Sequence, residues 1–185
     1  MKKIMLVICC LCFFSSLSAW DGKRQGFIFG GGLGIGPAII TGSGADDLVD
    51  WDVEVRVPVV TSFYIGGALN DQLMMYYNEK TNWYKLGGHI WTASNSTFAI
   101  TYFFEEEAPS FEVSGGIGLA TVSAIDVDSE TNYGIGLHFT AGFEFYPHCM
   151  VEGGVQYSAV FDTLLGETIA IHHLVPFVGL SFFGY

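Results

Sequence analysis

Long hydrophobic runs are missing from the chain after residue 20, because glycines or polar residues interrupt every apolar stretch. A transmembrane helix needs about 20 consecutive apolar residues, so we expect no membrane-spanning helix in this part of the chain. Charged residues are also scarce, at 14% of the sequence, whereas half of the residues are hydrophobic and 24 are glycines. This composition is too apolar for a disordered chain. A chain that is rich in hydrophobic residues but has no long hydrophobic run indicates that these residues are spread over alternating positions.

Cysteine is nearly absent beyond the N-terminal segment. Cys9, Cys10 and Cys12 lie close together near the start of the chain, and Cys149 stands alone after them. A single cysteine cannot form an internal disulfide, so we assign Cys149 no chemistry.

The N-terminal segment has the features of a secretory signal peptide. A basic start is followed by an apolar stretch over residues 4–14 and by small residues, with cleavage expected after Ser18 or Ala19. A lipoprotein signal is the alternative, but the cysteines lie inside the apolar stretch. We therefore expect a signal peptide at residues 1–19 and one domain at residues 20–185.

Basic residues are few. The sequence holds seven, and removal of the signal peptide with Lys2 and Lys3 leaves five against 19 acidic residues, a net charge of −14. The phosphate backbone of a nucleic acid repels so acidic a protein. We therefore expect no nucleic-acid partner.

What the chain does contain is strict alternation. In residues 133–146, YGIGLHFTAGFEFY, the odd positions are almost wholly apolar and the even positions are small or polar. A period of two predicts a β-strand with two different faces. Strands of soluble domains have about five or six residues, whereas a tilted strand that crosses a bilayer needs about 9–11. The length of this segment favours a membrane strand.

The same alternation returns along the chain in eight candidate strands. They span residues 26–37, 49–69, 72–79, 97–105, 111–122, 133–146, 150–160 and 169–185. Short connectors at 70–71, 106–110 and 147–149 alternate with longer polar ones at 41–50, 80–96, 123–132 and 161–168. A sheet in hydrocarbon must close on itself to satisfy its backbone. The pattern predicts an all-β fold, an eight-stranded antiparallel up-and-down transmembrane β-barrel with short periplasmic turns and long outer loops.

The interior of so narrow a barrel is filled by side chains, which accounts for the glycines on the polar face. We expect an interior polar network of Arg56, Glu112, His138, Glu144 and Glu152. Buried charges are costly unless paired, so we hypothesise that Arg56 and His138 neutralise some of the carboxylates. The network is either a structural plug or a path for protons or solutes.

The apolar faces are expected to contact outer-membrane lipid, with Ile117, Leu119, Phe139 and Phe143 as lipid-facing residues. Aromatic residues gather near the expected strand ends, as in barrels that place these rings at headgroup level. They are Phe104, Phe111, Phe145, Tyr146 and Tyr185 at the periplasmic end, and Tyr77, Trp83, Trp91, Tyr133 and Phe161 at the outer end.

Candidate chemistry is limited. His172 and His173 invite a catalytic hypothesis with Ser158 as nucleophile, but adjacent residues on a strand face opposite ways, and no triad spacing is present. Acidic residues at 126–130 and at Asp46, Asp47 and Asp50 lack the spacing of a calcium loop. We expect no metal and no cofactor.

Several segments resemble the small outer-membrane β-barrel proteins of Gram-negative bacteria, the outer membrane protein A/X/W-like family. They are GFIFGGGLGIG, APSFEVSGGIGLATVSA, the segment at 133–146 and the terminal FVGLSFFGY. The resemblance implies an assembly signal at Phe183 and Tyr185 that the barrel-assembly machinery reads, although Ser181 and Gly179 stand where the family often has apolar residues. It also implies a non-enzymatic structural or surface role, with an extracellular ligand or surface partner bound by the outer loops. Passage of small hydrophobic solutes and, less favoured, lipid modification are the alternatives.

Overall fold

The computed structural model describes residues 23–44, 52–126, 131–164 and 167–185, and these residues form strands and turns only. The expected signal peptide and Asp46, Asp47 and Asp50 lie outside them. No helix in the described residues is long and apolar enough to cross a membrane. The strands are β1 (Gly26–Ile35), β2 (Ala38–Ser43), β3 (Glu54–Arg56), β4 (Val59–Asn70), β5 (Leu73–Leu86), β6 (His89–Phe103), β7 (Ser110–Ala124), β8 (Asn132–Tyr146), β9 (Cys149–Leu164) and β10 (Glu167–Gly184).

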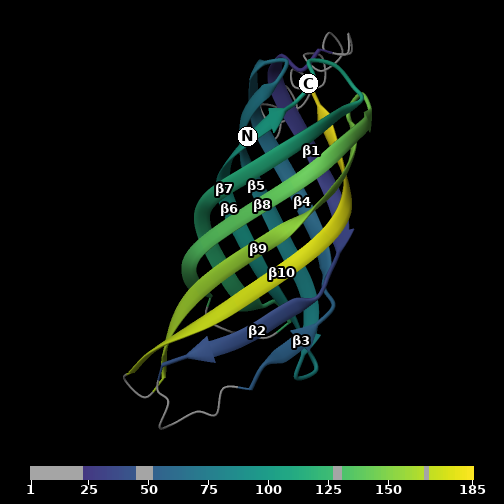
Figure 1. Cartoon of the computed structure of the whole chain (residues 1–185). Coiled ribbons are helices and arrows are strands. Elements are labelled where there is room, and N and C mark those ends of the chain that lie inside the picture. The colour runs from purple at the N-terminus through teal and green to yellow at the C-terminus, as the bar shows by residue number, and fades with distance from the viewer. Residues whose placement is uncertain (1–22, 45–51, 127–130, 165–166) are drawn as a thin grey trace, which may run out of the picture.

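These strands form one antiparallel sheet that closes into a barrel, as Figure 1 shows. Consecutive strands from β4 to β10 are neighbours, and β1 pairs with both β4 and β10. Residues near both ends of the described chain lie together, since Phe29 in β1 pairs with Gly184 in β10. We call this the terminal end of the barrel, and the opposite end the loop end. The expected all-β, eight-stranded, up-and-down barrel is confirmed.

Prolines divide two of the eight barrel strands, so that ten segments are seen. The pairing of β1 with β10 stops at Ile35 and resumes in β2 at Ile39 with the same register, which places Pro37 opposite Pro176. In the same way, the register that pairs β1 with β4 continues in the pairing of β2 with β3. It places Gly36 opposite Pro58. Because proline has no backbone N–H, it cannot donate to the ladder. The pairing among three neighbouring strands is therefore interrupted at one height, although β10 itself is continuous.

Beyond this break the wall is not fully paired. The pairing of β4 with β5 ends at Val59 and Trp83, and β3 pairs with β2 alone among the described strands. In Figure 1, β2 and β3 lie together at the loop end of the barrel. The side of β3 that faces β5 is thus an unpaired strand edge.

The connectors at the terminal end are short, as predicted, but the expected loop at 80–96 is wrong. Strands β5 and β6 continue through this region and meet at Gly87 and Gly88, whose φ angles are 60° and 87°. Glycine adopts positive φ without strain and suits a tight hairpin. The polar residues that suggested a loop, such as Lys80 and Asn82, are buried in the lumen instead.

The expected loop at 161–168 is also wrong in part, because Leu164 of β9 pairs with Glu167 of β10. Strand β7 ends at Ala124 and β8 begins at Asn132, so a longer connector remains between these strands. The connectors that include residues 45–51 and 127–130 lie partly outside the described residues.

Candidate functional site in the barrel lumen

The lumen at the terminal end is filled by a cluster around Glu144 of β8. The Arg24 guanidinium pairs with Glu144, with Nε 2.9 Å from Oε2, and donates to the carbonyl oxygens of Asp71 and Glu105. The hydroxyl of Tyr185 donates to the other oxygen of Glu144 at 2.6 Å. These contacts join the first described residues, β8 and the last residue of the chain. They close the terminal end of the lumen.

The middle of the lumen holds a second ion pair, between Lys80 of β5 and Glu152 of β9. The Lys80 ammonium lies 2.8 Å from Glu152 Oε1, and both side chains are almost fully buried. Tyr64 and Ser181 donate to the same oxygen at 2.9 and 2.6 Å. Buried pairs of this kind persist when further hydrogen bonds satisfy the charges, as they do here.

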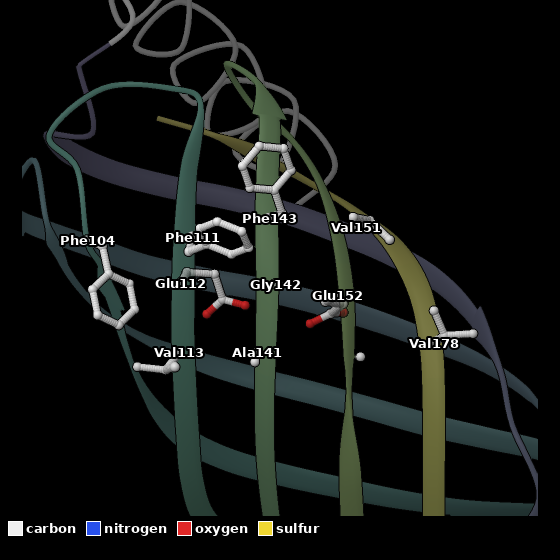
Figure 2. Close-up of a pocket in the computed structure, with 11 residues that line it drawn as sticks. Phe104, Phe111, Glu112, Val113, Ala141, Gly142, Phe143, Val151, Glu152 and Val178 are labelled. Carbon is white, nitrogen blue, oxygen red and sulfur yellow. The ribbon is translucent and has the colours of Figure 1, made fainter.

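Glu112 of β7 is the exception in this network. Neither carboxylate oxygen has a hydrogen-bond partner among the described residues, although the residue is only 2% exposed. Figure 2 shows the carboxylates of Glu112 and Glu152 pointing toward each other on either side of Gly142. The glycine leaves the space that they enter, since a Cβ on Gly142 would lie 2.5 Å from Glu112 Oε1.

Toward the loop end the lumen becomes less charged. His138 lies between Thr97 and Asn78, at 3.1 and 3.3 Å, and Asn82 donates to Gln156 at 3.2 Å. Nearer still to the loop end lies an apolar cluster of Ala38, Ile40, Tyr84, Ala93, Ala120, Val122, Val160 and Val175. The described lumen is therefore sealed by charge and rings at one end and filled with apolar side chains at the other.

The predicted place of Arg56 in this network is wrong. Arg56 lies in β3 at the loop end, where its guanidinium pairs with Glu54 and both side chains are 39% exposed. Arg56 keeps the inward parity of β4, but β3 pairs with β2 at the loop end, whereas the buried carboxylates lie on strand segments nearer the terminal end. Glu112, His138, Glu144 and Glu152 do lie buried in the lumen.

Sequence reasoning missed the two cations that pair with the carboxylates. Lys80 was placed in an expected loop, yet it has the same parity as Tyr76 and Asn78 and so continues the inward face of β5. Arg24 precedes the first strand by two residues, on the inward parity of Gly26 and Ile28. Extending both alternating patterns by a few residues would have found them.

The outer wall carries the apolar parity, as predicted. Ile117, Leu119 and Phe139 are exposed, and Phe143 is half-buried beside Phe111, with ring centroids 4.8 Å apart. Small residues, Ala141 and Gly153, contribute to a shallow groove of about 700 Å³ there, whose labelled residues appear in Figure 2.

Two aromatic residues of the expected girdles do not face outward. Tyr185 is buried at the terminal end, and Trp91 is half-buried against the apolar cluster of the lumen, where its Nε1 donates to the carbonyl of Leu86. Trp91 shares the inward parity of Ala93, which the sequence interpretation overlooked. The other eight aromatic residues are exposed.

The residues expected to form the assembly signal also point inward. Phe183 is 4% exposed and stacks on Tyr64, and Tyr185 binds Glu144. The outward residues near the end of β10 are Val178, Leu180 and Phe182. This parity explains Ser181 and Gly179, which lie on the lumen side.

The two histidines of the catalytic hypothesis face opposite ways. His173 is buried in the lumen opposite Ser158, but its Nε2 lies 3.1 Å from the hydroxyl of Tyr84. His172 lies on the outward parity, where it contacts Tyr157 at 2.9 Å and Ser43 at 3.1 Å. Among the described residues, no group of three His, Cys, Asp or Glu side chains could hold a metal ion.

A closed eight-stranded barrel with an apolar outer wall and a polar lumen defines a transmembrane β-barrel of the outer-membrane type. One solved structure supports this fold. Neisserial surface protein A matches with a TM-score of 0.52 and 13% identity, over 84% of this chain and 97% of that one.

Two further structures are similar at lower scores. The outer membrane protein OprG of Pseudomonas aeruginosa has a TM-score of 0.47 and 13% identity, over 87% of this chain and 96% of that one. The attachment invasion locus protein Ail of Yersinia pestis has a TM-score of 0.41 and 12% identity, over 85% and 99%. No family model matches the chain. No curated protein matches it either.

Proposed function

We propose that the mature chain, from about residue 20, acts in the outer membrane of a Gram-negative bacterium as a non-enzymatic structural or surface-interaction protein without an open channel. The terminal end would face the periplasm, and the loop end would face outward. The observation that carries this proposal is the filled lumen. The ion pairs of Arg24 with Glu144 and of Lys80 with Glu152 lie one above the other, and rings fill the space beside them.

The loop end offers a braced surface for a partner. The backbone N–H of Ile90, beside the β5–β6 turn, donates to the Asp126 carboxylate at 3.2 Å, and the N–H of Ile125 donates to the carbonyl of Ile90 at 3.0 Å. His89 contacts Asp126 at 3.5 Å. These contacts fix the hairpin of β5 and β6 against the start of the connector that follows β7. A fixed surface loses less entropy on binding than a free loop.

The test uses whole cells that display the protein. We expect replacement of residues 125–131 by a short glycine–serine linker to abolish adhesion of the cells to their surface partner, while the barrel stays folded. Replacing residues 106–109 at the terminal end by the same linker is the matched control and should leave adhesion unchanged. Purified wild-type protein should conduct no ions in a planar bilayer. Steady conductance, or adhesion that survives replacement of 125–131, argues against the proposal.

A second candidate is passage of small hydrophobic molecules through the wall, because of the unpaired edge of β3. This edge lies beside the apolar cluster of the lumen, which includes Ile40 of β2, the partner strand of β3. A molecule that entered from the loop end would meet apolar side chains first and the Lys80–Glu152 pair below them. The unpaired edge is then its exit into the lipid.

Cross-linking tests this second candidate. The register of β4 on β5, continued past Val59, brings Val57 opposite Lys85. A Val57→Cys and Lys85→Cys variant in a Cys149→Ser background would tie β3 to β5 when oxidised. We expect oxidation to stop uptake of a fluorescent fatty acid by vesicles and reduction to restore it. Equal uptake in both states removes this candidate.

A further inference from the structure

Hydroxyl side chains stand opposite one another on the outer wall, one on each of four neighbouring strands. The registers pair Thr61 of β4 with Thr81 of β5, Thr81 with Ser94 of β6, and Ser94 with Thr121 of β7. Neighbouring strands lie about 4.8 Å apart, so these hydroxyls form a continuous row. Further hydroxyls flank the row on both sides. We call the array the hydroxyl face; it comprises Thr61, Thr81, Thr92, Ser94, Ser96, Thr121 and Ser123.

The members of the hydroxyl face bind one another only in part. The hydroxyls of Thr81 and Ser94 lie 2.8 Å apart, and those of Thr92 and Ser123 lie 3.3 Å apart. A hydroxyl can donate one hydrogen bond and accept two. Thr81 is only 9% exposed, so the acceptor capacity for a molecule that lies against the wall belongs to its half-buried partner Ser94 and to Thr92 and Ser123.

The hydroxyl face is continuous with the lipid-facing surface. On β6 the outward residues run from Ile100 and Phe98, both exposed and apolar, directly to Ser96. On β7 they run from Leu119 to Thr121. An apolar band on such barrels ends where the hydrocarbon ends, and polar side chains begin at headgroup level. A molecule on the hydroxyl face is therefore level with the lipid head groups at the loop end.

Two aromatic rings and one carboxylate border the face. Tyr77 is 40% exposed and Trp83 is 39% exposed. Trp83 Nε1 donates to the Thr61 hydroxyl at 2.9 Å, which fixes its ring beside the row. Glu79 accepts hydrogen bonds from Tyr77 and Ser96. Rings that cover apolar C–H groups, with hydroxyls and a carboxylate beside them, suit a sugar ring, which presents both C–H groups and hydroxyls.

From this geometry we propose that the hydroxyl face binds the saccharide head group of a glycolipid in the leaflet at the loop end. The occupant is a membrane glycolipid because the face begins where the lipid-facing band ends. Neutral sugar hydroxyls fit the face better than phosphates do, because phosphates need cations. Among the described outward residues of β5, Lys85 is the one cation, and it lies at the border of the face. The proposal goes beyond the function proposed above, because the hydroxyl face does not use the connector at 125–131.

The test measures the temperature at which the folded protein loses its resistance to SDS, seen as a change of electrophoretic mobility. Wild-type protein is folded into phosphatidylcholine vesicles with and without lipopolysaccharide. We expect lipopolysaccharide to raise the transition temperature of the wild type. A Thr81→Val and Ser94→Ala variant should fold but lose that shift. Trp83→Leu should reduce it. Thr163→Val, which removes an exposed hydroxyl from β9, is the matched control and should keep the full shift.

The outcomes separate the proposal from its rivals. A shift of equal size in the wild type and the Thr81→Val and Ser94→Ala variant overturns it, and so does the absence of any shift in the wild type. An equal shift from the lipid-free oligosaccharide of the same lipopolysaccharide also overturns it, because the face would then bind soluble sugars. Cell adhesion is not measured, so failure of this proposal leaves the proposed surface role untouched.

Discussion

The ammonium of Lys80 lies 2.8 Å from Glu152 Oε1 at the centre of the barrel, and neither side chain is open to solvent. Lys80 also lies over the ring of Phe177, with its nitrogen 4.8 Å from the ring centre. Removal of one partner from such a pair leaves an uncompensated buried charge.

Lys80→Met is expected to lower the free energy of unfolding by about 3–5 kcal/mol, because Glu152 would stay buried without its cation. Urea titration of the barrel in detergent micelles measures this. The double variant Lys80→Met and Glu152→Gln should recover most of the loss. Lys85→Met, at an exposed position of the same strand, is the control and should change stability by less than about 0.5 kcal/mol. A single-variant loss as small as that of the control would contradict the role of the pair.

The two arginines at opposite ends of the barrel should behave differently. Arg24→Ala leaves Glu144 buried and is expected to cost about 3–5 kcal/mol, whereas Arg56→Ala removes an exposed pair worth about 0–1 kcal/mol. Thermal loss of SDS resistance compares both variants in one experiment. If Arg56→Ala proved the more damaging, the assignment of Arg24 to the lumen would be wrong.

Glu112 offers a change that should stabilise the protein. Glu112→Gln replaces a carboxyl group that has no hydrogen-bond partner among the described residues. Because burial penalises an ionised carboxylate more than a neutral amide, we expect a gain on the order of 1 kcal/mol in alkaline buffer, where the carboxyl group must ionise. Glu144→Gln serves as the opposite case, since Glu144 is paired with Arg24, and it should destabilise. Denaturation of both variants under identical conditions checks the sign of each change.

Close approach of two strands makes Gly134 sensitive to any side chain. A Cβ at this position would lie 1.8 Å from the carbonyl oxygen of Ala159 on β9. Gly134→Ala should therefore cost about 1–3 kcal/mol through local overpacking and reduce the yield of folded barrel. At Gly67 the nearest atom would be 3.5 Å away, so Gly67→Ala should be tolerated. The fraction of protein that migrates as the folded form reports both results.

On β10 the residues that fill the lumen alternate with residues that face outward. We propose that the assembly machinery reads the outward residues Leu180 and Phe182, and that the expected signal residues Phe183 and Tyr185 act after folding. Leu180→Ser should reduce the amount of folded protein in cell envelopes. Tyr185→Phe should fold in normal amounts but lose about 1 kcal/mol, because it lacks the hydroxyl that binds Glu144. Normal envelope levels of Leu180→Ser would refute this division.

The sequence predicted the architecture well because alternation is a local property. In residues 133–146, neighbouring side chains face opposite sides whatever else the chain does, so Glu144 and His138 could be placed on the inner face correctly. Arg56 also had inward parity, but a proline two residues later interrupts its strand. Parity alone does not reveal at which height along the barrel a residue lies.

Pairing partners were beyond the reach of the sequence for a different reason. Lys80 and Glu152 are 72 residues apart, and their contact depends on the register of the three strands between β5 and β9. The polar run around Lys80 also resembles a loop when hydrophobicity alone is considered. Only closure of the barrel makes these polar residues lumen-facing.

The alignment of Pro37 with Pro176 has a mechanical consequence. At this height the pairing among three adjoining strands is interrupted, so β2 and β3 can bend relative to β1 and β4 about a crease in the wall. Amide protons on either side of the crease would then exchange with solvent at two distinct rates, slow beneath it and fast above it.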